Sequence, residues 1–281
     1  MAGLIPNAPK QGADYTFPGQ FQWTTLLQWI TAVIMIFLGS LGVQPIPSEA
    51  PCADISVNSF FWRHTANVEG TNRCYMVYVP EEYNNNQPWP LIVFLHGLAE
   101  SGNDPSRLAD IGLGPAIRKA PNNFPCLVAM PQLPFGTDWE KGPEHITEVL
   151  ADMRSRYNVD PDRIYLTGIS VGGDNTWRYA ANNPGVFAAL LPVAAIPDVN
   201  LAEKLTDLPI WALNGGLDVI GLPFITQAMV DRINAAGGQA RFTPVGLIGH
   251  EAWIEIYDDP EVIAWLLSQR RQTQEVDTEN E

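Results

Sequence analysis

From Cys52 onward, short apolar runs alternate with longer stretches that have a helical pattern of apolar and polar positions. Leu91–Leu95 is apolar at every position, which is typical of a strand buried on both faces of a sheet. We expect further strands at Ile55–Trp62, Cys74–Val79, Cys126–Met130, Arg163–Thr167, Ala188–Val193, Ile210–Leu213 and Arg241–Val245. The expected helices are Gly142–Tyr157, Asp174–Asn182, Pro223–Ala236 and Pro260–Arg270. This alternation predicts an α/β fold: a mostly parallel, doubly wound sheet with helices on both faces, whose first two strands are antiparallel.

The first 51 residues do not follow this pattern. Residues 1–25 form a polar leader, residues 26–43 are mostly apolar, and residues 44–51 are typical of a proline-stiffened linker. The apolar segment is just long enough to span a membrane, so it fits an uncleaved anchor, a signal peptide or an amphipathic packing helix. The leader holds one basic residue, Lys10, which argues against a simple signal peptide. We favour an export-type anchor, with a membrane as candidate partner and the α/β domain, residues 52–270, outside the cytoplasm; residues 271–281 form an acidic tail.

The charge balance narrows the class of partner. The chain has 16 Lys and Arg against 31 Asp and Glu, which gives a formal net charge of −15. Such a surface repels nucleic acid and anionic membranes, so we expect no nucleic-acid partner. It favours neutral or cationic small substrates, or it serves only to keep the protein soluble.

The three cysteines do not indicate a metal site, because they lack a Cys-x-x-Cys spacing and do not cluster with the four histidines. We therefore expect no metal and no cofactor. Cys126 lies in an apolar run and is interpreted as a buried core thiol. Cys52 and Cys74 flank an expected hairpin, and a disulfide between them remains open, since it requires export.

The stretch Gly168–Gly173, with the sequence Gly-Ile-Ser-Val-Gly-Gly, carries the strongest chemical signal. It follows an expected strand and precedes an expected helix, and Ser170 has glycine two residues away on either side. This is the pattern of a nucleophile elbow, in which a tight turn leaves no room for flanking side chains and exposes the serine hydroxyl. Ser170 is therefore the candidate nucleophile.

A serine nucleophile needs a general base, and His250 is the only histidine after Ser170. It lies in a loop after an expected strand, where it points toward the carboxyl edge of the sheet. The third member is a carboxylate between the two, and Asp218 is favoured because it follows the strand Ile210–Leu213 through a short turn. Asp198 is the second choice, and Asp207 precedes a strand and so faces the opposite edge. Asp218 could alternatively be the N-cap of the helix from Pro223.

The residues that close the strand Leu91–Leu95 are expected to complete the site. The backbone N–H groups of Leu98 and Val171 are the candidate oxyanion donors. We assign His96 and Gly97 to the substrate pocket, although the His96 side chain is expected to be structural, as are His64 and His145. Three tryptophans near the site in sequence form either an aromatic pocket wall or part of the core: Trp139, Trp177 and Trp253.

With these motifs in place, the chain resembles the α/β-hydrolase superfamily. Four stretches narrow the resemblance to esterases of the prolyl-oligopeptidase-like group, which are relatives of dienelactone hydrolases, feruloyl esterases and polyhydroxybutyrate depolymerases: Leu95–Gly102, Pro131–Gln132, Asp160–Gly168 and Gly249–Trp253. The resemblance covers about Cys52 to Arg270. It implies a Ser170, Asp218, His250 triad. Two departures are Asn214, where the family often has histidine, and Asp174-Asn175 after the elbow, which we expect to alter the pocket.

These observations lead to the hypothesis of a serine hydrolase that cleaves small carboxylic esters through an acyl-enzyme. Two alternatives are open. The first is a membrane-tethered, non-catalytic binding or assembly subunit with a hydrolase fold, which the N-terminal segment and the altered residues after the elbow suggest. The second is a serine peptidase, which uses the same catalytic groups and differs only in the leaving group of its substrate.

Overall fold

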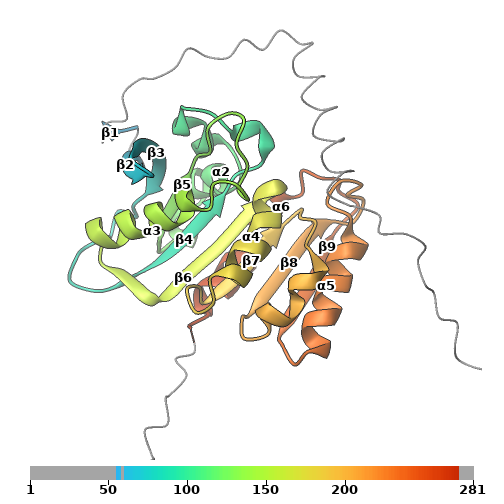
Figure 1. Ribbon diagram of the computed structural model, residues 1–281. Helices are drawn as coiled ribbons and strands as arrows, with labels where there is room; N and C mark the ends of the chain where they lie inside the picture. The colour runs from blue at the N-terminus through green and yellow to red at the C-terminus, as the bar shows by residue number, and fades with distance from the viewer. Residues whose placement is uncertain (1–54, 58–59, 272–281) are drawn as a thin grey trace, which may run out of the picture. The chain divides into compact units, whose positions relative to one another are not determined.

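The apolar runs of the sequence form one sheet in the computed structural model, which describes residues 55–57 and 60–271 (Figure 1). Within these residues the sheet has nine strands in the order β1-β2-β3-β5-β4-β6-β7-β8-β9. The strands are β1 (Ile55–Ser56), β2 (Phe61–Val68), β3 (Thr71–Tyr78), β4 (Trp89–Leu95), β5 (Leu127–Pro131), β6 (Val159–Ile169), β7 (Ala189–Val193), β8 (Ile210–Gly215) and β9 (Ala240–Val245). The six strands from β5 to β9 are parallel, and β1, β2 and β3 pair antiparallel.

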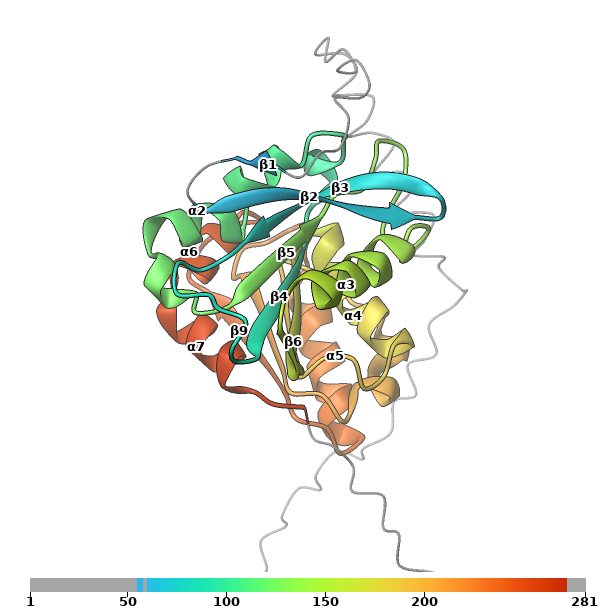
Figure 2. The ribbon, with the colours of Figure 1, turned by 90° about the vertical axis from the view of Figure 1, so that its left-hand side faces the viewer.

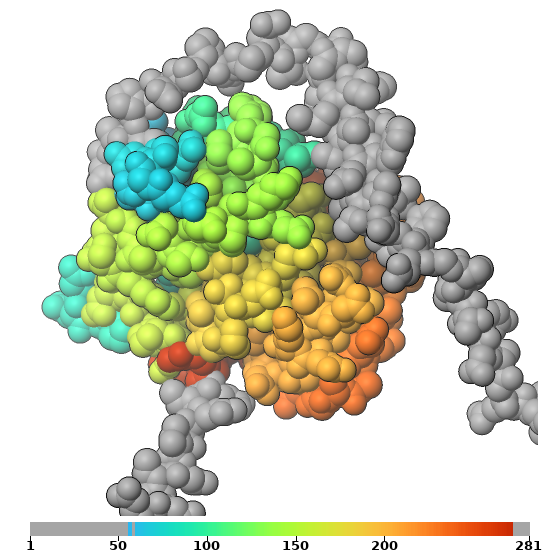
Figure 3. All heavy atoms as spheres, in the orientation of Figure 1, coloured from blue at the N-terminus to red at the C-terminus, as the bar shows by residue number. Residues whose placement is uncertain are grey.

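Helices cover both faces of this sheet, as Figure 2 shows edge-on. One core lies between the sheet and α3 (Glu144–Arg156), α4 (Val171–Asn182) and α5 (Pro223–Ala235). The other lies between the sheet and α2 (Leu113–Lys119), α6 (Trp253–Asp258) and α7 (Pro260–Ser268). Figure 3 shows the sheet hidden behind α3, α4 and α5. Four 3₁₀ helices connect the described elements: η1 (Leu98–Glu100), η2 (Pro105–Asp110), η3 (Pro121–Asn123) and η4 (Val199–Leu205).

The fold class that the hydrophobic pattern predicts is confirmed. β4 illustrates why, because Leu91, Val93 and Leu95 belong to one core while Ile92 and Phe94 belong to the other. A strand between two layers of helices needs apolar side chains on both faces, and this produces a continuous apolar run. The antiparallel start is also confirmed, since β2 and β3 pair over their whole length.

Two details of the prediction are wrong. The strand expected over Ile55–Trp62 is two strands, since β1 ends at Ser56, β2 begins at Phe61, and the N–H of Val57 donates to the carbonyl of Phe61 (2.8 Å). The short helices α2 and α6 were not predicted. α2 contains glycine and proline, which disfavour a helix, and the six residues of α6 are too few to establish a period.

The order of the strands creates a topological switch point next to β6. β4 pairs with β5 on one side and β6 on the other, and the chain leaves β4 and β6 toward helices on opposite faces, α2 and α4. Ligands of open α/β sheets bind at such a switch point, beyond the carboxyl ends of the strands. Because Leu95 pairs with Gly168, the segments that follow β4 and β6 begin side by side.

The N-terminal segments 1–25, 26–43 and 44–51 lie outside the described residues, so the leader, the anchor and the linker stay predictions. None of the helices in the described part of the chain combines the length and the apolarity needed to cross a membrane. At the other end, Arg271 forms an ion pair with Asp162 (2.8 Å), and residues 272–281 are not described. Cys126 is fully buried as predicted, and Cys74 is disulfide-bonded, while Cys52 lies outside the described residues.

Replacing Leu166 with alanine should lower the free energy of unfolding by about 2–5 kcal/mol, because the change empties part of a fully buried site in β6. The same change at Leu247, which is 84% exposed, should alter it by less than about 0.5 kcal/mol. Urea denaturation measures both values. Equal losses in the two variants would contradict the packing described here.

Candidate active site

Ser170 occupies the turn between the end of β6 and the first residue of α4. Its backbone has φ 53° and ψ −124°, a combination that residues other than glycine rarely adopt. The turn is held by two backbone hydrogen bonds, from Ser170 N–H to Val193 O (3.1 Å) and from Asp174 N–H to Ser170 O (2.9 Å). This geometry lifts the side chain of Ser170 out of the turn and toward His250.

The glycines of the elbow allow β6 and α4 to approach each other closely. A Cβ atom on Gly168 would lie 2.6 Å from the backbone of Gly172, and one on Gly172 would lie 2.2 Å from the carbonyl oxygen of Leu95. Both distances are far below a van der Waals contact. A side chain at either position would push α4 away from the sheet and relax the turn that presents Ser170.

The structure brings Ser170, His250 and Asp218 together from three separate connections. Ser170 follows β6, Asp218 lies between β8 and α5, and His250 lies between β9 and α6. His250 Nε2 is 2.9 Å from Ser170 Oγ, and His250 Nδ1 is 2.9 Å from Asp218 Oδ2. These distances allow a proton to pass from the serine hydroxyl to the imidazole.

Asp218 is held as a carboxylate despite its burial at 3% exposure. Burial alone would raise its pKa, but the hydrogen bonds from His250 and from the N–H groups of Gly221 (2.7 Å) and Ile220 (2.8 Å) hold its pKa below the ordinary value. An ionised carboxylate only accepts hydrogen bonds, so His250 carries its proton on Nδ1. Nε2 is then the free acceptor that faces Ser170.

The other acidic candidates do not reach this site. Asp198 caps η4 by accepting a hydrogen bond from the N–H of Asn200 (3.1 Å), and Asp207 is exposed in the turn before β8. The helix-cap alternative for Asp218 is wrong. The N-cap of α5 is Leu222, without a side-chain hydrogen bond, because the chain makes a further turn between Asp218 and Pro223.

The expected oxyanion donors both begin a helical turn next to Ser170. Leu98 is the first residue of η1 and Val171 the first of α4. The first N–H groups of a helix have no partner within that helix, so both amides are available to an external acceptor. Gly97 lies directly beside the serine, since a Cβ atom on it would be 3.7 Å from Ser170 Cβ.

The aromatic pocket wall is wrong for two of its three members. Trp177 is fully buried and Trp139 is 2% exposed, and both belong to the core on the α3, α4 and α5 side. Trp253 is partly buried, and its ring meets that of His250 edge to face with centroids 5.4 Å apart.

His96 has the structural role expected for its side chain, and its assignment to the substrate pocket is wrong, because it is enclosed by the loop that contains Leu133 and Trp139. It is fully buried, its Nε2 accepts a hydrogen bond from the N–H of Leu133 (3.0 Å), and its carbonyl accepts one from Trp139 Nε1 (3.1 Å). Burial lowers the pKa of His96 to about 4, which keeps the ring neutral.

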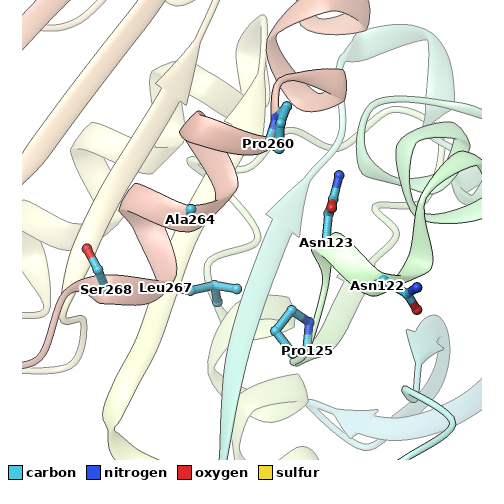
Figure 4. Close-up of a pocket in the computed structure, with 7 residues that line it drawn as sticks. All are labelled: Asn122, Asn123, Pro125, Pro260, Ala264, Leu267 and Ser268. Atoms are coloured by element: carbon cyan, nitrogen blue, oxygen red, sulfur yellow. The ribbon is translucent and has the colours of Figure 1, made fainter.

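The remaining histidines are buried structural residues. His64 Nε2 lies 2.6 Å from the hydroxyl of Tyr157, and His145 Nδ1 lies 3.2 Å from the carbonyl of Gly142. Within residues 55–57 and 60–271, no group of three or more His, Cys, Asp or Glu side chains is arranged to hold a metal ion. A surface pocket between η3 and α7 shares no residue with the triad (Figure 4).

Two residues that the sequence singled out only as departures from the family pattern lie at the site. Asp174 is one turn beyond Ser170, and its carboxylate accepts a hydrogen bond from the N–H of Ile196 (2.6 Å). Burial raises the pKa of Asp174 to about 7, against the opposing effects of that hydrogen bond and of His250. Asn214 is fully buried and donates to the carbonyls of Gly221 (2.7 Å) and Ala195 (3.3 Å). It thereby braces the loop that carries Asp218.

Comparison with known proteins agrees with this architecture. Residues 140–217 match the prolyl oligopeptidase family. A crystal structure of a thermostable esterase superposes with a TM-score of 0.67 at 29% identity, covering 75% of this chain and 63% of that one. The feruloyl esterase module from Clostridium thermocellum, complexed with sinapinate, gives a TM-score of 0.62 at 16% identity over 82% of this chain and 95% of its own.

Two curated proteins are similar over shorter stretches. Poly(3-hydroxyalkanoate) depolymerase C of Paucimonas lemoignei is 29% identical over 123 residues, which are 38% of this chain and 28% of the depolymerase. The bifunctional acetylxylan esterase/xylanase XynS20E of Neocallimastix patriciarum is 27% identical over 156 residues, which are 53% of this chain and 22% of that protein. The chain thus spans about a quarter of each. The fold is that of the α/β-hydrolases, and the resemblance to esterases of this superfamily is confirmed.

Asp174→Asn should remove a pH dependence of stability. The pKa of Asp174 is higher in the folded protein than in the unfolded chain, so the folded state binds the proton more tightly and stability falls as pH rises toward about 7. Asparagine still accepts the hydrogen bond from Ile196 but does not titrate. Urea denaturation at pH 5 and pH 8 should show the wild type losing stability relative to the variant at the higher pH. A constant difference would contradict the raised pKa of this carboxyl.

Proposed function

We propose that this protein is a serine hydrolase that cleaves carboxylic esters. The observation that carries the proposal is the hydrogen-bonded chain from Ser170 through His250 to Asp218, with the serine on a strained turn at the switch point of the sheet. The esterases and the depolymerase among the similar proteins support the same reaction class. Two of these proteins are named as esterases, and the poly(3-hydroxyalkanoate) in the name of the depolymerase is a polyester.

In the proposed reaction, Ser170 Oγ attacks the ester carbonyl while His250 Nε2 takes the hydroxyl proton. The N–H groups of Leu98 and Val171 stabilise the negative oxygen of the tetrahedral intermediate, each by about 3 kcal/mol. His250 then returns the proton to the leaving alcohol, and the C–O bond breaks to leave an acyl-enzyme. Water repeats the sequence, releasing the acid and restoring Ser170. Asp218 holds the imidazole in the required tautomer and stabilises its charged form.

We propose a small neutral ester as substrate and no nucleic-acid partner, because the net charge of −15 disfavours anionic ligands. We also propose that the enzyme acts outside the cytoplasm. The disulfide at Cys74 supports export, since disulfides persist in oxidising compartments. Attachment to a membrane through residues 26–43 belongs to the same proposal.

Peptide hydrolysis is a second candidate, favoured by the match of residues 140–217 to the prolyl oligopeptidase family. The same three side chains serve both reactions, and the substrates differ in the leaving group. Turnover of p-nitrophenyl acetate and of an acetylated peptide p-nitroanilide by the same preparation distinguishes them. A non-catalytic subunit would turn over neither and would not react with a fluorophosphonate probe.

Ser170→Ala should lower kcat for p-nitrophenyl acetate by at least about 10⁴-fold, because it removes the nucleophile and leaves only the oxyanion donors and binding. Labelling by a fluorophosphonate should disappear as well. Circular dichroism and thermal unfolding serve as controls for the fold. Retained turnover in a folded Ser170→Ala variant would contradict the proposed mechanism.

Asp218→Asn should lower kcat by about 10⁴-fold, because the amide can donate to His250 Nδ1 and so favours the wrong tautomer. Asp198→Asn is the matched control, since Asp198 follows the neighbouring strand β7 but caps η4. Its kcat should stay within about twofold of the wild type, because it leaves the triad intact. A large loss in Asp198→Asn with little loss in Asp218→Asn would reverse the assignment of the acid.

A further inference from the structure

Large apolar side chains are exposed on the connections that carry Asp218 and His250 and on the first turns of the helices that follow them, α5 and α6. Nine large apolar residues are exposed in the described part of the chain, and six of them lie here: Leu217, Val219, Ile220, Phe224, Leu247 and Ile254. We call these six the apolar rim. Val219 and Leu247 are each 84% exposed. Single exposed apolar residues are ordinary, whereas a gathering of them at one place indicates a binding surface.

Backbone hydrogen bonds hold together the two loops that carry most of the apolar rim. The N–H of Leu217 donates to the carbonyl of Ile248 (2.9 Å), and the N–H of Gly216 donates to that of Val245 (3.1 Å). Asp218 and His250 connect the same loops through their side chains. The rim is therefore built around the two residues that would activate Ser170.

The rim is also free of charge at its centre. Between Leu208 and Val230 the only charged residue is Asp218, which is buried, and residues 242–249 contain none. The exposed Glu251 and Glu255 flank Ile254, so negative charge borders this uncharged part of the rim, which offers no Lys or Arg to an anionic ligand. Its chemistry fits a neutral, apolar group.

The order of the strands decides which part of an ester would meet the rim. β4, which leads to the candidate oxyanion donor Leu98, lies on one side of β6, while β8 and β9 lie on the other. The oxygen of the leaving alcohol must come within hydrogen-bond distance of His250 Nε2 to receive its proton, about 3 Å. The alcohol portion of the substrate therefore extends toward the β8 and β9 side, where the rim lies.

We propose that the apolar rim binds the alcohol portion of the substrate, so that the enzyme prefers esters of large apolar alcohols. This inference rests on the proposed ester hydrolysis and adds a specificity to it. It concerns the alcohol and makes no demand on the acyl group. The rim residues are specificity-determining, since none of them takes part in the proton transfers.

A series of acetate esters tests this, because a constant acetyl group gives the same acyl-enzyme throughout. From ethyl to hexyl acetate, each kept below its solubility limit, kcat/KM of the wild type should rise by about tenfold or more, since each added methylene is partly removed from water. kcat should be unchanged where deacylation is rate-limiting, because that step is common to the series. Ethyl esters of increasing acyl length form the companion series.

The test variant combines Val219→Ser, Leu247→Ser and Ile254→Ser, all at exposed positions outside the triad. It should lose most of the rise across the alcohol series while keeping the wild-type kcat/KM for ethyl acetate within about threefold. Val57→Ser is the matched control, since Val57 is exposed next to β1 at the opposite edge of the sheet. It should keep the full alcohol dependence.

A flat alcohol series in an active wild type, or a triple variant that keeps the rise, overturns the inference and leaves the proposed function standing. A preference that follows the acyl series alone overturns it as well. Turnover that begins only above the solubility limit of the ester would mean that the rim binds aggregated substrate, and this outcome overturns the inference. A specific activity that depends on enzyme concentration would mean that the rim binds a second copy of this chain, and this outcome overturns it as well. Inactivity toward every ester overturns both proposals.

Discussion

The strained turn at Ser170 is the constraint on which the arrangement of the site depends. A residue in this backbone conformation costs on the order of 1–3 kcal/mol, so it persists only where the surrounding structure holds it. Here β6 lies between β4 and β7, Val193 accepts the N–H of Ser170, and the glycines allow α4 to sit against the end of β4. The same close approach brings the first N–H groups of η1 and α4 to the serine. Candidate nucleophile and oxyanion donors are thus positioned by a single packing contact.

Two carboxyls at this site, the buried Asp218 and the partly buried Asp174, show how the local surroundings decide the charge of a group. Asp218 is buried but receives hydrogen bonds from His250 and two backbone N–H groups, and its pKa falls below the ordinary value. Asp174 receives one backbone hydrogen bond, which is too little to offset burial, and its pKa rises to about 7. The contrast follows from the balance between the desolvation of each carboxylate and the hydrogen bonds and charge that oppose it. It leaves Asp218 ionised next to His250, as the proposed mechanism requires.

Much of the candidate site could be predicted from local signals. The elbow follows from glycine spacing between a strand and a helix, His250 from being the only histidine after Ser170, and Asp218 from its place after a strand. The tryptophans could not be resolved in this way. Trp177 lies on the elbow helix, but its position seven residues after Ser170 puts it on the face that packs against the sheet. Nearness in sequence does not define a side chain's direction, because that depends on which face of the helix is covered.

The sequence by itself determined the order of strands and helices, the elbow and the candidate residues, because these are read from periodicity and from residues with special backbone requirements. Only the tertiary structure decided that β4 and β6 are neighbours, that Asp198 caps η4 while Asp218 meets His250, and that the loops bearing the apolar rim are joined by hydrogen bonds. These features arise from contacts between segments far apart along the chain. The free energy of such contacts depends on which surfaces of the protein meet, and no local pattern of residues specifies which surfaces these are.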